Sequence, residues 1–130
     1  MSFEKGKIIE TLDLFPQPRT VEEIVAARKD LKPGTLAYQF YWILVEAALR
    51  NEQEVYRDGD GNLRHGPPGG LIDNTVGYRL PRKFDGRRTT AGTVSITLRD
   101  MHTDYTPPLA RSIPLDGQPN GVVVYRAEIA

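Results

Sequence analysis

The chain has 130 residues, of which 39% are hydrophobic and 26% are charged, a balance that is typical of a globular protein and excludes wholesale disorder. Its 17 Lys and Arg residues equal its 17 Asp and Glu residues, which excludes a long-range attraction of the whole molecule to phosphate. The absence of cysteine excludes disulfides, thiolate metal ligands and a cysteine nucleophile.

The apolar segments are too short to span a membrane. The longest, residues 36–49, is interrupted by Gln39 and Glu46. The first residues contain no apolar signal core and no small-residue cleavage site. We therefore expect a cytoplasmic protein with no membrane partner, built as one compact domain or as a small domain with an appendage.

The first part of the chain predicts three helices. Residues 3–15 carry an apolar face at helix spacing, made of Ile8, Ile9, Leu12 and Phe15. Thr20 and Glu23 form a capping-box pattern that starts a short second helix, which ends near residues 28–31. Residues 32–35 are a turn into a third helix that extends to about residue 52. Its core stripe consists of Leu36, Phe40, Ile43 and Ala47.

A hairpin and a series of extended segments are predicted after the third helix. Residues 54–57 and 63–65 are short extended arms joined by the turn-forming residues 58–62. Residues 65–70 are typical of a linker or a broad loop. Beyond it we predict strands at residues 75–80, 93–98 and 122–129. The proline-rich residues 105–121 indicate an extended arm with little regular structure.

The order of the first elements resembles that of the winged helix-turn-helix superfamily. Residues 20–27 resemble its second helix, residues 32–40 resemble the start of its recognition helix, and residues 55–64 resemble its wing. We therefore expect an α+β protein. Residues 1–66 would form a three-helix winged-helix-like domain with a β-hairpin wing, and residues 67–130 a β-rich or extended region packed on it or on a partner.

The resemblance implies a DNA-binding surface. In this superfamily the start of the third helix enters the major groove, and the wing contacts the backbone or the minor groove. Bases would then be contacted by Thr35, Tyr38 and Gln39, and phosphates by Lys32, Arg57 and Arg64.

A second candidate for nucleic-acid binding is the basic cluster in residues 79–88. It consists of Arg79, Arg82, Lys83, Arg87 and Arg88, with Tyr78 and Phe84 interleaved. Such a cluster can clamp phosphates or stack on exposed bases. The alternative is a solvated loop whose charges pair with nearby aspartates.

Trp42 lies in the middle of the polar stripe of the third helix, where a tryptophan is unusual. Either the C-terminal strands fold over it and it belongs to the core, or it joins Tyr38 and Tyr41 as an anchor for a partner protein. Glu46, close to it in the same stripe, would repel phosphate and argues against DNA.

We expect no metal site, no cofactor and no catalytic residues. Asp58, Asp60 and Asn62 match the first positions of a calcium loop, but Leu63 stands where that loop needs glycine. His65 and His102 have no partner at metal-ligand spacing. No nucleophile or phosphate-cradling motif is present.

Three functions remain open for a non-enzymatic binding protein. The first is a winged-helix transcriptional regulator that binds double-stranded DNA and forms a homodimer. The second is a protein-interaction module, such as a phage-type inhibitor or adaptor, anchored by Tyr38, Tyr41 and Trp42. The third is a structural component whose residues 105–129 pair with a neighbouring subunit's sheet edge. The element order and the basic cluster favour the first of these. The neutral charge and the surface of Trp42 and Glu46 count against it, and the neutral charge is no obstacle to the second.

Overall fold

A computed structural model of the chain describes residues 19–81 and 90–129. Within these residues the fold is α+β, as expected, with four helices and two small antiparallel sheets. The elements follow one another as α2 (Val21–Ala26), α3 (Leu36–Leu49), β1 (Val55–Arg57), β2 (Leu63–His65), β3 (Leu71–Ile72), α4 (Asp73–Arg79), α6 (Ala91–Thr103), β4 (Ala110–Ile113) and β5 (Val124–Ala127). The helix predicted at residues 3–15 lies outside the described residues.

Side-chain caps start both of the described helices that precede the hairpin. Thr20 and Glu23 form the predicted capping box of α2, in which the Glu23 amide donates to the Thr20 hydroxyl at 3.2 Å. The Thr35 hydroxyl accepts from the Tyr38 amide at 3.2 Å and so caps α3. α3 ends at Leu49, before the predicted end at residue 52, because Asn51 adopts a left-handed φ of 52°.

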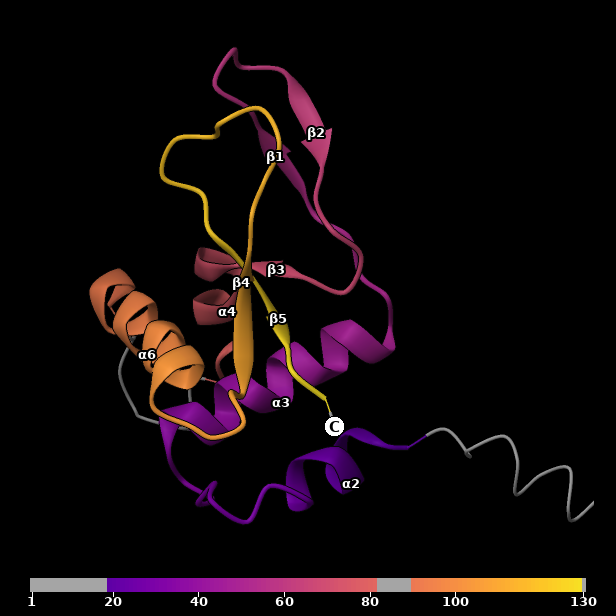
Figure 1. Cartoon of the computed structure of the whole chain (residues 1–130), viewed down its shortest axis with the longest axis vertical. Helices are drawn as coiled ribbons and strands as arrows, with labels where there is room; N and C mark the ends of the chain where they lie inside the picture. Colours follow the sequence, from indigo (N-terminus) through magenta and orange to yellow (C-terminus); the bar gives the residue numbers. More distant parts are fainter. Residues whose placement is uncertain (1–18, 82–89, 130) are drawn as a thin grey trace, which may run out of the picture.

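The predicted hairpin is confirmed, with β1 and β2 antiparallel and Tyr56 opposite Arg64. One side of it packs against the loop at residues 114–121: the Tyr56 hydroxyl donates to the Asp116 carbonyl at 2.8 Å. At Gly117 (φ 81°) an added Cβ would lie 2.6 Å from the Asp58 Cβ, so only glycine permits this approach. The hairpin and this loop project together at one end of the molecule (Figure 1).

The strand predicted at residues 93–98 is wrong, because these residues belong to helix α6. Val94 and Leu98, which alternate with polar neighbours, are also four residues apart and lie together on the buried face of a helix. Ile96, which an alternating strand would bury beside them, is 54% exposed. The Thr90 hydroxyl accepts from the Thr93 amide at 3.2 Å and caps this helix.

The strand predicted at residues 75–80 is also wrong, since residues 73–79 form helix α4. Its N-terminus is held by Glu54, which comes from a distant part of the chain. The Glu54 carboxylate accepts from the Ile72 amide and from the Thr75 hydroxyl, the latter at 2.6 Å. α4 packs closely on α6 at Gly77, where an added Cβ would lie 2.9 Å from a methyl group of Val94.

The second sheet has the strand order β3–β5–β4 and is antiparallel throughout. The strand predicted at residues 122–129 is confirmed by β5. The residues 105–121 that we expected to be an irregular arm contain the regular strand β4, which pairs with β5 so that Ser112 lies opposite Tyr125.

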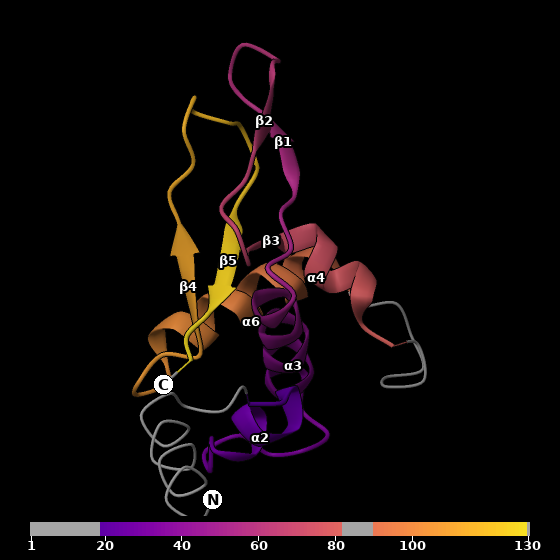
Figure 2. The ribbon, with the colours of Figure 1, turned by 90° about the vertical axis from the view of Figure 1, so that its right-hand side faces the viewer.

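Helix α3 is the centre of the core. Phe40, Leu44 and Val45 are completely buried in it, and α2, α4, α6 and strand β5 all pack against the helix. In Figure 2 the sheet of β3, β5 and β4 lies above α3, α2 lies below α3, and α4 and α6 flank it. Residues from both predicted regions, 1–66 and 67–130, contribute to this core. No helix of the described chain is long and apolar enough to cross a membrane.

Candidate functional site

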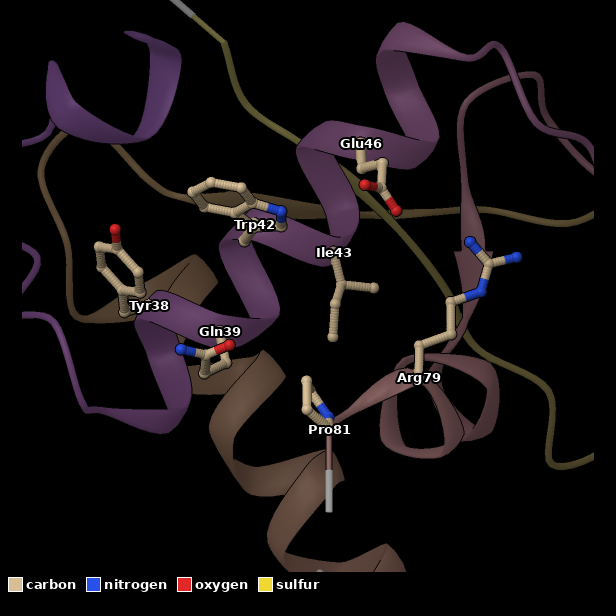
Figure 3. A pocket seen from close by; sticks show the side chains of 7 residues that line it. All are labelled: Tyr38, Gln39, Trp42, Ile43, Glu46, Arg79 and Pro81. Atoms are coloured by element: carbon tan, nitrogen blue, oxygen red, sulfur yellow. The ribbon is translucent and has the colours of Figure 1, made fainter. Parts of the chain in front are cut away.

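A groove of about 380 Å³ lies beside α3, where α4 ends. Helix α3 contributes one wall, formed by Tyr38, Gln39, Trp42, Ile43 and Glu46. The other wall is Arg79, the last residue of α4, and Pro81. Figure 3 shows these side chains around the hollow, with Tyr38 and Trp42 at one end and Arg79 at the other.

An aromatic pair borders the groove. Tyr38 and Trp42 are four residues apart on α3, and their ring centroids are 6.4 Å apart with the planes tilted by 36°. Both side chains are half-buried and pack on the edge of the core. Trp42 is therefore neither fully buried nor fully exposed to solvent. Its inner part contributes to packing, and its outer part stays accessible.

Tyr41 lies on a different face of α3 from this pair. It is 1% exposed, and its hydroxyl donates to the Glu128 carbonyl at 2.8 Å. Burial raises the pKa of the Tyr41 hydroxyl above its usual value. The expected role of Tyr41 as a surface anchor does not agree with this position, because residues at consecutive positions of a helix point about 100° apart.

The charged groups at the groove are largely paired. Arg79 donates two hydrogen bonds to the Glu52 carboxylate, at 2.8 and 2.7 Å. These bonds lower the pKa of Glu52 and raise that of Arg79. Glu46 contacts Arg50 at 3.7 Å across one turn of α3, and both side chains are exposed enough to remain in water. The rim of the groove thus carries both signs of charge.

One carboxylate makes several of the contacts that hold the hairpin turn. Asp58 accepts from the amides of Asp60 and Asn62, each at 2.9 Å, and from the Arg64 side chain at 2.8 Å. The Arg64 guanidinium, followed by these amides, lowers the pKa of Asp58. Arg57 donates to the Gly61 carbonyl at 2.8 Å. Among the described residues, no group of three or more His, Cys, Asp or Glu side chains is arranged to hold a metal ion.

The residues expected to bind DNA are spread over the molecule. Lys32 and Thr35 are exposed in the turn before α3, whereas Tyr38 and Gln39 line the groove. The hairpin that carries Arg57 and Arg64 lies at the opposite end of the long axis from α2 and the turn that follows it (Figure 1). Arg79 is paired with Glu52. The other members of the basic cluster, Arg82, Lys83, Arg87 and Arg88, lie outside the described residues.

Sequence reasoning singled out the α3 side of the groove but missed the opposite wall. The polar stripe with its central tryptophan indicated Gln39, Trp42 and Glu46 as neighbours on one helix face. Nothing local indicates that Arg79 packs across from them, because its contact with Glu52 spans 27 residues of chain.

Comparisons with protein-family models, with curated proteins and with solved structures found no match to this chain.

Proposed function

We propose that this chain is a small binding protein that recognises a protein partner through the groove between α3 and α4. The observation that carries the proposal is the partly exposed pair of Tyr38 and Trp42 at the rim of a hollow of about 380 Å³. Large aromatic side chains beside a pocket provide much of the binding energy in protein interfaces. Here they sit on a helix that is fixed by the core, so little ordering is needed when a partner binds.

The charge around the groove supports a protein partner over a nucleic acid. Phosphate binding requires cations that are available to replace counterions. At this site the Arg79 guanidinium is already held by Glu52, and Glu46 adds a negative charge beside Trp42. An apolar centre with a rim of mixed charge is typical of surfaces that bind proteins.

A selection from random peptides tests the proposal and needs no identified partner. The library is selected on the full chain after depletion on the bare support, and the enriched peptides are then tested on Trp42→Ala. We expect enriched peptides with an aromatic or leucine anchor, and a loss of at least about tenfold in affinity for Trp42→Ala. Leu63→Ala is the matched control, because Leu63 is an apolar residue, 64% exposed, on the hairpin. Peptides that bind the original chain and Trp42→Ala equally well, or no enrichment at all, would contradict the proposal.

A DNA-binding regulator is the second candidate, favoured by the order of α2, turn, α3 and hairpin and by the exposed Lys32 before α3. Random-sequence duplex DNA is titrated into the protein at low and moderate salt, with the fluorescence of the single tryptophan, Trp42, as the signal. Micromolar binding that falls steeply with salt and is lost in Lys32→Glu would favour DNA. If the groove binds protein instead, neither salt condition gives binding.

A further inference from the structure

One stripe of α3 is only partly covered by the part of the chain that the structure describes. Gln39, Trp42 and Glu46 are half-buried in it, and Leu49 at the end of the helix is 46% exposed. These positions are three or four residues apart, so their side chains follow one another along one face of the helix. The stripe includes the α3 side of the groove in Figure 3.

We propose that a second copy of this chain covers the stripe, with the two α3 helices packed antiparallel about a twofold axis that passes between Trp42 and Ile43. This inference rests on the proposed function, since it names the partner of the same groove. A twofold interface must be complementary to itself, because each surface meets its own copy. The stripe meets this condition in its hydrogen-bonding groups, its shape and its charge.

The hydrogen-bonding groups match across the axis. Gln39 precedes Trp42 by three positions, and Glu46 follows Ile43 by three positions. An antiparallel pair centred between Trp42 and Ile43 therefore places the Gln39 amide of each copy opposite the Glu46 carboxylate of the other. An amide donates two N–H groups and a carboxylate only accepts, so both contacts are favourable. A parallel pair would instead bring the two Glu46 carboxylates together.

The shape is reciprocal as well. Trp42 stands at the rim of its own hollow, close to the axis, and the hollow continues between Ile43 and Pro81. In the antiparallel pair each Trp42 ring faces the hollow of the other copy. The part of the ring that is exposed in one chain is buried in the pair, and buried aromatic area is the main gain of such a contact.

The net charge of the chain and the size of the contact set the expected affinity of the dimer. The chain has a net charge of zero, so two copies do not repel each other at a distance. Helix α3 has 14 residues and is about 21 Å long. One face of a helix of this length buries less than the roughly 1,200–2,000 Å² of a stable interface. We therefore expect a dissociation constant of about 10–100 µM.

Sedimentation equilibrium of the full chain, at concentrations from about 5 to about 500 µM, measures the dissociation constant of the dimer. Substitutions at Gln39 test the register. Gln39→Glu brings two carboxylates together on each side of the axis, and we expect a dissociation constant about tenfold higher. Gln39→Lys places an ammonium group against Glu46 of the other copy, and we expect a value about threefold lower at low salt. In the double variant Gln39→Glu with Glu46→Lys, the opposite charges face each other again, and dimerisation returns to within about threefold of the original value.

Asn120→Glu and Asn120→Lys are the matched controls. Asn120 also carries a side-chain amide and is exposed, but its loop lies beside the hairpin, away from α3 (Figure 1). Neither control changes the dissociation constant. Trp42→Ala abolishes the dimer at every concentration, and circular dichroism checks that this variant is folded. The Gln39 series decides the question even if Trp42→Ala does not fold.

A chain that is monomeric at the highest concentration overturns the inference, and so does a dimer that is indifferent to the Gln39 and Glu46 substitutions. Failure here is distinct from failure of the proposed function. If the chain is monomeric but the selected peptides still require Trp42, the groove binds a different protein. If Trp42 affects neither peptides nor self-association, both proposals fail.

Discussion

Tyr41 and Trp42 are adjacent in the chain but lie on different sides of α3. Tyr41 faces the sheet, is 1% exposed and donates a hydrogen bond to the Glu128 carbonyl. Trp42 faces the groove, is half-buried and contacts the ring of Tyr38. The same helix thus has a side on which both the apolar surface and the polar atoms have partners, and a side on which an aromatic surface stays open. The difference separates the residues that stabilise the fold from those available for binding.

The largest effect that tests this comparison is on stability. Tyr41→Ala should lower the free energy of unfolding by about 3–5 kcal/mol, because it leaves a cavity in the core and removes the donor to Glu128. Trp42→Ala should lower it by only about 1–2 kcal/mol, because part of the side chain already contacts water. Urea denaturation followed by circular dichroism measures both values. Equal losses would show that Trp42 is a core residue and would remove the distinction between the two sides.

Two carboxylates extend the comparison to polar groups. The Glu54 side chain accepts from the Ile72 amide and the Thr75 hydroxyl at the start of α4, whereas Glu46, on the groove side of α3, forms a 3.7 Å contact with Arg50. We expect Glu54→Ala to lower the free energy of unfolding by about 1–3 kcal/mol. Glu46→Ala is the matched control and should change it by less than about 0.5 kcal/mol.

Hydrogen exchange locates the Glu54 effect. In Glu54→Ala the amides of α4 should lose protection more than those of α3, because the lost acceptor belongs to the first turn of α4. Uniform loss of protection in both helices would mean that the carboxylate does not act on α4 specifically.

A smaller effect is expected from the Tyr41 hydroxyl at high pH. Burial raises the pKa of Tyr41 in the folded protein, so its contribution to stability is fully present below the usual tyrosine pKa of about 10. This contribution to stability is lost as the pH rises above about 10 and through the raised pKa of Tyr41. Burial also raises the pKa of Tyr125, so part of the loss of stability at high pH comes from that residue.

Tyr41→Phe separates the two tyrosines. At neutral pH the variant should be about 1 kcal/mol less stable, since the Glu128 carbonyl loses its donor. Above a pH of about 10 its stability should fall less steeply than that of the original chain. Urea denaturation at a series of pH values, with tyrosinate absorbance as the titration signal, gives both quantities. An unchanged alkaline slope would assign the loss to groups other than Tyr41.

The parts of the fold that were predictable are those with local signals. The Thr20 and Glu23 box, the apolar spacing of α3 and the turn residues of the hairpin each lie within a few positions of the structure they specify. The groove side of α3 was predictable for the same reason, since helix spacing alone brings Gln39, Trp42 and Glu46 together.

Helix α4 and the far wall of the groove depend on contacts that a local pattern does not contain. The start of α4 has no side-chain cap of its own. Its hydrogen-bond acceptor is Glu54, which lies 18 residues before Ile72 and 21 residues before Thr75. In α6, Val94 and Leu98 fit both an alternating strand and a helix. Burial of Met101 on the same face is what distinguishes the helix, and a window that ends at residue 98 omits it.

The hairpin provides the most localised test, because one titrating carboxylate, Asp58, accepts three hydrogen bonds within it. The Arg64 guanidinium, helped by the amides of Asn62 and Asp60, lowers the pKa of Asp58. The contribution of Asp58 to stability is therefore present above the usual aspartate pKa of about 3.9 and is lost as the pH falls through the lowered value. Amide chemical shifts of residues 56–64 should change over this acidic range before those of α3 do. Asp58→Asn keeps an oxygen that accepts from the amides but loses the ion pair, so its hairpin should not respond to pH there. A hairpin that changes only together with α3 would show that the turn has no stability of its own and is held entirely by the core.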